Sequence, residues 1–275
     1  MFTISGDDLS VMVLDPVADR DRLGTRFTAA GQMFRITDGN GMDLMSGPTF
    51  PDTFNTYDAQ GIPDSFNHLP LYDSTSRGGD VGRLALVLGI GVVDGEANRI
   101  IRPSVWDIRR EASSATFTAR EQFGPYDVTL VRNVTIAGRV ITSRTEVHND
   151  SNRFLPLSWY PHPFFPFHVT RDVCWFHTAP QMPENSGYTF SDGVLERAME
   201  PDAKGFFQPL TYNKPQSLSV HILHDRVGEV VMKTDYPVWH FPIWGNNRTF
   251  SVEPYLERTV FPGEQFAWNL TYRMG

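Results

Sequence analysis

Short segments with alternating polar and apolar residues follow one another along this chain, and they limit its fold more than any other feature. Residues 127–138 place Val128, Leu130, Val134 and Ile136 at even spacing, as on one face of a strand. No window of a dozen residues carries an apolar stripe at helical spacing that is free of Gly, Pro or β-branched clusters. The pattern predicts an all-β protein, either a sandwich or a barrel.

Turn residues separate these segments. "AGR" links residues 127–138 to the alternating run 139–149, a turn at residues 225–228 divides the segment 217–235, and "PGE" divides 249–261 from 265–274. Two stretches, 46–82 and 179–216, have no period and are rich in turn residues, so we expect long ordered loops there. Neither stretch resembles a linker, which predicts a single domain over residues 1–275.

The composition excludes several classes of partner. The net charge of −8, without any basic stripe, argues against a nucleic-acid partner. The chain contains no run of about 18 apolar residues, so no transmembrane helix is expected. The first ten residues lack the pattern of a signal peptide. The single cysteine, Cys174, excludes an internal disulfide and fits a reducing compartment. We therefore expect a cytoplasmic monomer or homodimer that acts on an uncharged small molecule.

Aromatic residues are abundant, with 20 Phe, 9 Tyr and 6 Trp. They indicate either a thick β core or a cleft in which flat rings stack on a sugar. The densest stretch is "SWYPHPFFPF" (158–167), in which two prolines flank His162 and restrict its backbone. Its rings and one distant tryptophan are candidate substrate-binding residues, namely Trp159, Tyr160, Phe164 and Trp244.

Three histidines, His162, His168 and His177, raise the question of a metal site. Their spacings of six and nine match no common zinc motif. We therefore predict no metal site, and hydrogen bonds to neighbours are the simpler role for His168 and His177.

Glu253 is the most notable acidic residue. It lies in an apolar strand context immediately before Pro254, which cannot donate to a sheet and so predicts the end of the strand. Burial among aromatic residues would raise the pKa of such a carboxyl group. The alternative is a surface carboxylate that pairs with Arg248 or Arg258.

Other polar candidates are weaker. The aperiodic segment 67–80 contains His68, Asp73, Arg77 and Asp80, which suit ligand contacts but are also common in turns. Nucleophile and phosphate-loop motifs are absent, and the apolar neighbours of Cys174 predict an inert thiol.

Two stretches resemble the galactose mutarotase-like group, the aldose 1-epimerases and their relatives. The first is "TEVHNDSNRFLPLSWYPHPFFPF" (145–167), which presents a histidine, and the second is "FSVEPYLERTVFPGEQFAW" (250–268), which presents a glutamate. "GTRFTAAGQMFRI" (24–36) and "LALVLGIGVVDG" (84–95) resemble a less-studied branch of that group. The resemblance covers about residues 20–275 and implies a large antiparallel β-sandwich with few or no helices.

The resemblance implies that His162 is a general acid and Glu253 a general base of an aldose 1-epimerase-like isomerase. Such an enzyme opens a sugar ring by removing the proton of the C1 hydroxyl while it protonates the ring oxygen, and it needs no metal or cofactor. The two groups are expected on opposite sides of the anomeric centre, each within about 3 Å of its proton partner.

This sequence departs from the better-known members of the group in its upstream part. The usual "HGF"-type histidine and its arginine are absent, and only His68 and Arg77 stand in comparable positions. Asp192 or Asp202 would accept hydrogen bonds from sugar hydroxyls, and Arg77, Arg83 or Arg248 would suit a sugar phosphate. Two alternatives stay open, a carbohydrate-binding sandwich without activity and a lyase or hydrolase on the same fold.

Overall fold

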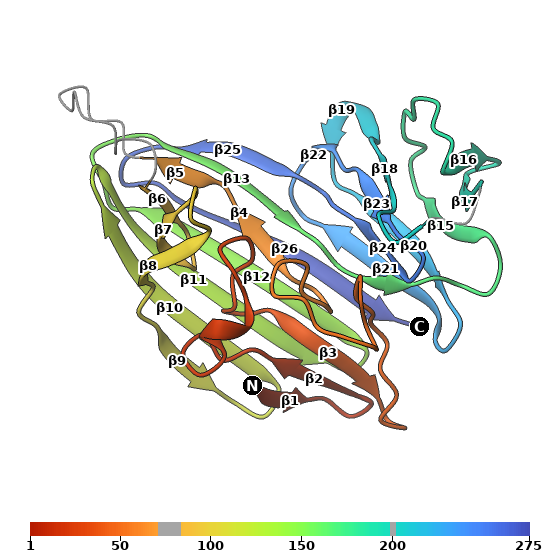
Figure 1. The fold of residues 1–275 in the computed structure, drawn as a ribbon, viewed down its shortest axis with the longest axis horizontal. Helices are drawn as coiled ribbons and strands as arrows, with labels where there is room; N and C mark the ends of the chain where they lie inside the picture. The colour runs from red at the N-terminus through yellow and green to blue at the C-terminus, as the bar shows by residue number, and fades with distance from the viewer. Residues whose placement is uncertain (71–83, 199–201) are drawn as a thin grey trace.

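One ten-stranded antiparallel sheet forms the base of the molecule (Figure 1). The structure is a computed structural model of the 275-residue chain, and it describes residues 1–70, 84–198 and 202–275. The strands of this sheet, in spatial order, are β16 (Tyr188–Ser191), β17 (Val194–Arg197), β15 (Asp172–Phe176), β20 (Ser219–His224), β21 (Gly228–Thr234), β26 (Gln265–Met274), β12 (Val140–Asn149), β11 (Tyr126–Ala137), β10 (Ser114–Phe123) and β9 (Asp107–Arg110).

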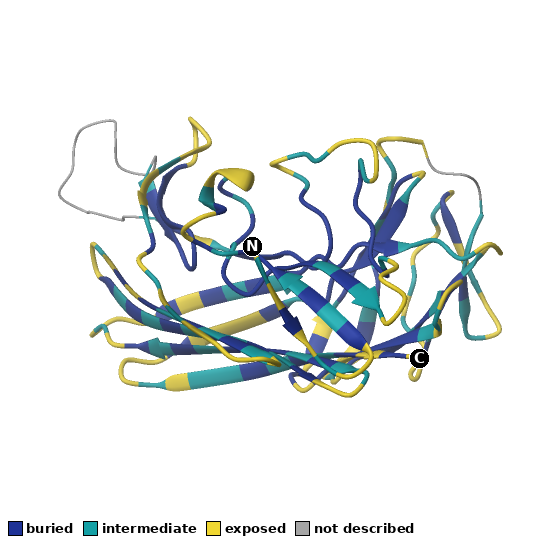
Figure 2. Ribbon diagram, turned by 90° about the horizontal axis from the view of Figure 1, so that it is seen from below, coloured by how far each residue is buried: buried dark blue, intermediate teal, exposed yellow. Residues whose placement is uncertain are grey.

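Smaller sheets lie against the large one, so that the protein is an all-β sandwich, as the alternation predicts (Figures 1 and 2). The only helix in the described ranges is the short 3₁₀ segment η1 (Arg20–Arg22). The smaller sheets are β1 (Phe2–Ser5), β2 (Leu9–Val13) and β3 (Met33–Asp38); β25 (Leu256–Val260), β13 (Leu155–Pro161) and β4 (Asp64–Phe66); β14 (Phe165–Pro166), β24 (Thr249–Val252), β23 (Ile243–Gly245) and β18 (Phe206–Gln208); β19 (Thr211–Gln216) and β22 (Val238–His240); and β5 (His68–Pro70), β6 (Leu84–Val87), β7 (Gly91–Asp94) and β8 (Arg99–Pro103).

The core follows the two-residue period of the long strands. In β11 the even-numbered residues from Tyr126 to Ile136 are buried, and the intervening residues are partly exposed. In β12 the buried face carries Ile141, Ser143, Thr145 and Val147, which fits the alternation of residues 139–149 in the sequence. Figure 2 shows this alternation of buried and more exposed residues along the long strands. Apolar burial on this face is the main stabilising contribution to the fold.

One charged residue occupies the buried face of β11. Arg132 stands between Leu130 and Val134 and is only 2% exposed. Its guanidinium forms two hydrogen bonds with the carboxylate of Asp64 in β4, one of them at 2.6 Å. A buried charge without a partner is costly. This ion pair therefore links the large sheet to β4 of a smaller sheet.

The predicted long loops are wrong in part. The stretch 46–82 contains β4 and β5, and the stretch 179–216 contains β16, β17, β18 and β19. These strands have three to six residues. Segments this short show too few alternations for a period to be recognised against their turn-rich flanks.

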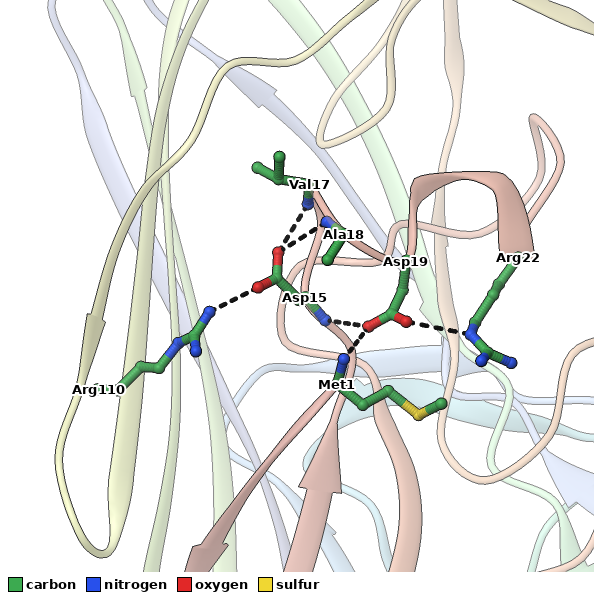
Figure 3. A network of polar contacts seen from close by, with 7 residues as sticks. All are labelled: Met1, Asp15, Val17, Ala18, Asp19, Arg22 and Arg110. Carbon is green, nitrogen blue, oxygen red and sulfur yellow. Dashed lines mark hydrogen bonds and ion pairs between the residues drawn. The ribbon is translucent and has the colours of Figure 1, made fainter.

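The N-terminal segment is held by two carboxylates, Asp15 and Asp19 (Figure 3). Asp15 accepts hydrogen bonds from the backbone N–H groups of Val17 and Ala18 and, at 2.5 Å, from Arg110 at the end of β9. Burial raises the pKa of Asp15, but these donors outweigh it and lower the pKa overall. Asp19 accepts from the Met1 amino group and from Arg22. These contacts fasten η1 beside the large sheet.

None of the helical segments that the structure describes has the length and apolar character needed to cross a bilayer. The division into a single domain remains a prediction.

Candidate active site

A pocket of about 360 Å³ opens where the ends of several short strands meet. Its walls come from the segments that follow β13 and β24, from β18 and β23, and from connections near the N-terminus. The lining residues are Arg26, Pro48, Tyr57, Asp58, Tyr160, His162, Phe164, Phe207, Trp244, Glu253 and Tyr255. Both residues that the sequence nominates for acid–base chemistry, His162 and Glu253, therefore face this pocket.

The backbone around His162 explains its two flanking prolines. The N–H groups of His162 and Phe164 donate to the carbonyl oxygens of Pro63 and Gly61, each at 2.8 Å. Pro161 and Pro163 occupy the alternate positions, at which this pairing requires no donor. Gly61 has a φ of +73°, in the left-handed region that favours glycine, and an added Cβ would meet Met33 O at 2.2 Å.

The same pattern positions Glu253. Its N–H donates to Pro242 O at 3.0 Å, and the N–H of Tyr255 donates to His240 O at 3.0 Å. Pro254 stands between them, where no donor is needed, and β24 ends at Val252 as the sequence predicts. Both candidate residues are thus held by extended backbone in which proline alternates with a hydrogen-bonded residue.

His162 and Glu253 are in direct contact. The His162 Nε2 atom lies 3.1 Å from Glu253 Oε1, and each residue is only 4% exposed. The two side chains were expected on opposite sides of an anomeric centre, and they are instead neighbours on one wall of the pocket. The alternative role for Glu253 as a surface ion-pair partner is wrong, because Arg248 pairs with Asp52 and Arg258 pairs with Glu264.

Burial favours the uncharged form of both partners. It raises the pKa of Glu253 to about 8, although the positive charge of Arg26 opposes this change. Burial and the charge of Arg26 together lower the pKa of His162 to about 3. At neutral pH the contact is therefore a hydrogen bond between a neutral imidazole and a protonated carboxyl group. The pair thus holds one proton that it can transfer, on the carboxyl group.

Aromatic rings surround this pair. The ring centroids of Phe164 and Trp244 lie 4.6 and 5.9 Å from that of His162, and Phe27 meets the imidazole edge-on at 5.9 Å. Tyr160 and Tyr255 stack on each other at 4.6 Å with nearly parallel planes. These rings exclude water from the imidazole and give the pocket flat apolar faces.

Arg26 lines the pocket but was not predicted from the sequence. Its guanidinium lies 4.6 Å from the ring centre of Phe27 and 4.9 Å from that of Tyr57, at the side of the pocket. It is the cation whose charge acts on both His162 and Glu253. Arg26 lies within the stretch 24–36 that carries part of the resemblance, but no periodicity in that stretch distinguishes it.

Three of the four predicted aromatic residues, Tyr160, Phe164 and Trp244, line the pocket. Trp159 does not. Adjacent residues of a strand point to opposite faces, and Trp159 is directed into the core, where its ring lies 5.3 Å from Trp268. The assignment of Trp159 to the substrate site is therefore wrong.

The remaining polar candidates do not join this pocket. His68 is exposed on β5, Asp192 and Asp202 are exposed, and none of the three lines it. Arg77, Arg83, Asp73 and Asp80 lie outside the described residues. His168 binds Thr170 and Asp225, and no group of three potential metal ligands from His, Cys, Asp and Glu occurs within the described ranges. Cys174 is fully buried, and burial raises its pKa.

The sequence matches no protein-family model and no curated protein. Solved structures do match it over nearly their whole length. A galactose mutarotase related enzyme from Lactobacillus acidophilus is 12% identical, with a TM-score of 0.64 over 100% of this chain and 97% of that one. A galactose mutarotase-like protein from Lactobacillus casei is 15% identical, with a TM-score of 0.61 over 100% of both chains.

This chain has the galactose mutarotase-like fold. An aldose epimerase homologue from C. elegans shares it as well, with 12% identity and a TM-score of 0.57 over 99% of this chain and 97% of that one. The fold implied by the histidine and glutamate stretches is thereby confirmed. Identity this low shows the fold alone, and a shared fold does not determine an activity.

Proposed function

We propose that this protein is an aldose 1-epimerase-like isomerase that interconverts the anomers of a sugar, with His162 and Glu253 as its acid–base pair. The observation that carries the proposal is the contact of 3.1 Å between these two buried titratable groups on the wall of an aromatic pocket. A pair of this kind costs stability, which favours a chemical role over a structural one. The galactose mutarotase-like fold supports the same conclusion.

The reaction needs one group that holds a proton to donate and one group that is free to accept a proton. A base removes the proton of the C1 hydroxyl and an acid protonates the ring oxygen, so that the C1–O5 bond breaks and an open-chain aldehyde forms. Rotation about C1–C2 and the reverse proton transfers close the ring on the other face. Both exchanging oxygens are bonded to C1, so two neighbouring side chains suffice to reach them.

The proton that burial retains on the pair suits this chemistry. The resemblance makes His162 the acid and Glu253 the base, whereas the raised pKa of Glu253 places the proton on the carboxyl group before a sugar arrives. Ring closure reverses ring opening at the same carbon, so each group is a donor in one half of the reaction and an acceptor in the other. One shared proton therefore serves both directions.

Arg26, Tyr160 and Trp244 have supporting roles in this proposal. Arg26 is always protonated and presents hydrogen-bond donors to sugar oxygens at the side of the pocket. It also disfavours a second proton on the pair, because its charge lowers the pKa of both His162 and Glu253. Tyr160 and Trp244 offer flat faces on which a sugar ring packs.

Saturation-transfer NMR of anomer exchange tests the proposal. Free hexoses and pentoses are examined with and without the protein at pH 7. We expect faster exchange for at least one sugar. If no sugar exchanges faster than in buffer but calorimetry detects binding, the protein is a carbohydrate-binding sandwich instead. New reducing ends released from oligosaccharides would indicate a lyase or hydrolase.

A further inference from the structure

A second pocket adjoins the candidate active site. It has a volume of about 510 Å³ and shares Pro48, Asp58 and Trp244 with the pocket that contains His162 and Glu253. Its own part is lined by Thr49, Asp52, Thr53, Lys204, Asn247 and Arg248, among others. Each pocket lies within the usual range of about 300–1,000 Å³ for small-molecule sites. A ligand longer than one sugar ring therefore has room beside the acid–base pair.

The second pocket offers both hydrogen-bond donors and hydrogen-bond acceptors. Within the described part of the chain, neither the Lys204 ammonium nor the side-chain amide of Asn247 has a hydrogen-bond partner, and both are exposed. Asp58 is partly buried, and its carboxylate makes no hydrogen bond or ion pair with another described residue. Vicinal hydroxyl groups both donate and accept, so a sugar satisfies such a set of partners.

The charges of this pocket favour a neutral occupant over a phosphate. Arg248 is already neutralised by Asp52 at 2.6 Å and also donates to Phe50 O at 3.3 Å. The Lys204 ammonium and the Asp58 carboxylate balance in charge as well, so the residues that line the pocket offer a dianion no net positive charge. The sequence-based suggestion that Arg248 binds a sugar phosphate is therefore not favoured.

Trp244 provides the wall between the two pockets. It lies on β23 opposite Phe207 of β18, and the Phe207 side chain is 52% exposed. The Trp244 ring is partly exposed and borders both spaces. An aromatic ring at the junction of two polar pockets suits a chain of sugars, because each pyranose has an apolar face that packs on a ring.

We propose that the second pocket binds the neighbouring sugar of a reducing disaccharide or longer oligosaccharide, whose reducing-end ring occupies the site of His162 and Glu253. This inference rests on the proposed function and specifies its substrate class. The additional ring binds through Asn247 and Lys204, while Trp244 holds the linkage between the rings.

The test compares anomer exchange of glucose, cellobiose, maltose, lactose and glucose 6-phosphate by saturation-transfer NMR. We expect at least one disaccharide to have a kcat/KM about tenfold or more above that of glucose. The double variant Lys204→Ala/Asn247→Ala should bring that ratio close to one. The matched control Lys214→Ala removes an exposed lysine of β19 that lines neither pocket and should preserve the ratio.

Three results would overturn the inference while leaving the isomerase intact. They are exchange of glucose at least as efficient as that of every disaccharide, a disaccharide preference that the double variant retains, and a preference for glucose 6-phosphate. Failure of the proposed function looks different, because then none of the five sugars exchanges faster than in buffer. Circular dichroism melting curves show whether the double variant remains folded.

Discussion

Two buried pairs of ionisable residues are linked through the backbone but differ in kind. Arg132 and Asp64 join through two hydrogen bonds inside the core, whereas His162 and Glu253 share one contact of 3.1 Å on the wall of a pocket. Neither Arg132 nor Asp64 lines that pocket. The backbone connects the pairs, because the carbonyl of Pro63, the residue before Asp64, accepts the N–H of His162.

The difference separates a structural pair from a reactive one. An arginine stays protonated, so the pair with Asp64 has no proton to give near neutral pH. Imidazole and carboxyl groups both titrate, and burial brings their proton affinities into a range where one proton stays on the pair. The first pair should therefore determine stability, and the second should determine activity.

The largest effect is expected when the reactive pair loses its proton exchange. Glu253→Gln keeps the shape of the side chain and a donor toward His162, so the protein should fold, but the amide cannot exchange the proton. We expect anomer exchange to fall by about 10²–10⁴-fold. The control Glu257→Gln alters an exposed carboxylate on β25 and should leave exchange unchanged. Retained exchange in Glu253→Gln would remove Glu253 from the mechanism.

Breaking the structural pair should instead lower stability. Arg132→Met leaves the carboxylate of Asp64 buried without its partner, which costs about 3–5 kcal/mol. Urea denaturation measures this loss. Arg120→Met is the control, since it breaks an exposed pair with Asp127 that contributes about 1 kcal/mol or less. Equal losses in the two variants would contradict the structural role of the Arg132–Asp64 pair.

The reactive pair should also leave a signature in stability against pH. The folded protein retains the Glu253 proton up to about pH 8, while an unfolded glutamate releases it near 4.5, so this group loses its stabilising effect as the pH rises. The lowered pKa of His162 acts in the opposite direction, but only below about pH 6.5. The net result is a decrease on the order of 2 kcal/mol between pH 6.5 and 8.

Comparing the native protein with Glu253→Gln isolates the contribution of Glu253 to the pH dependence of stability. Other titrating groups, such as Glu121, are present in both proteins. Denaturation curves at pH 6.5 and 8 should show the decrease in the native protein and a smaller one in the variant. Identical decreases would mean that Glu253 is not protonated in the fold at neutral pH.

The smallest effect concerns Arg26, the cation that acts on the reactive pair. Arg26→Met keeps an apolar stem beside Phe27 and Tyr57 but removes the charge that lowers the pKa of Glu253. The alkaline limb of the activity profile should therefore move up by roughly one pH unit. Arg144→Met, on the partly exposed face of β12, is the control and should leave the limb in place. A downward shift would contradict the electrostatic role of Arg26.

Much of the fold was predictable because its long strands are regular. The alternation of Val128 and Leu130 identified the buried face of β11, and Pro254 marked the end of β24. The same alternation places Arg132 on the buried face, but its partner Asp64 stands 68 residues earlier in a three-residue strand. Such a pairing depends on tertiary contacts that no local pattern contains.

The candidate site was predictable only where it carried a resemblance. His162 and Glu253 lie in the two stretches that resemble the mutarotase-like group, and the structure brings them together. Arg26, Asp58 and Phe207 reach the pocket from segments without a clear period. Trp159 was misassigned because aromatic content does not indicate which face of a strand a ring occupies.

The most direct test of the one-proton pair is the pH dependence of anomer exchange by the native protein, measured as kcat/KM on its best sugar. The pair keeps its proton until Glu253 titrates, so the rate should stay level from about pH 5 to 7 and fall about tenfold per unit above about 8. A rate that declines from pH 6.5 upward would mean that a protonated His162 of ordinary pKa is the acid. That result would contradict a neutral pair that shares a single proton.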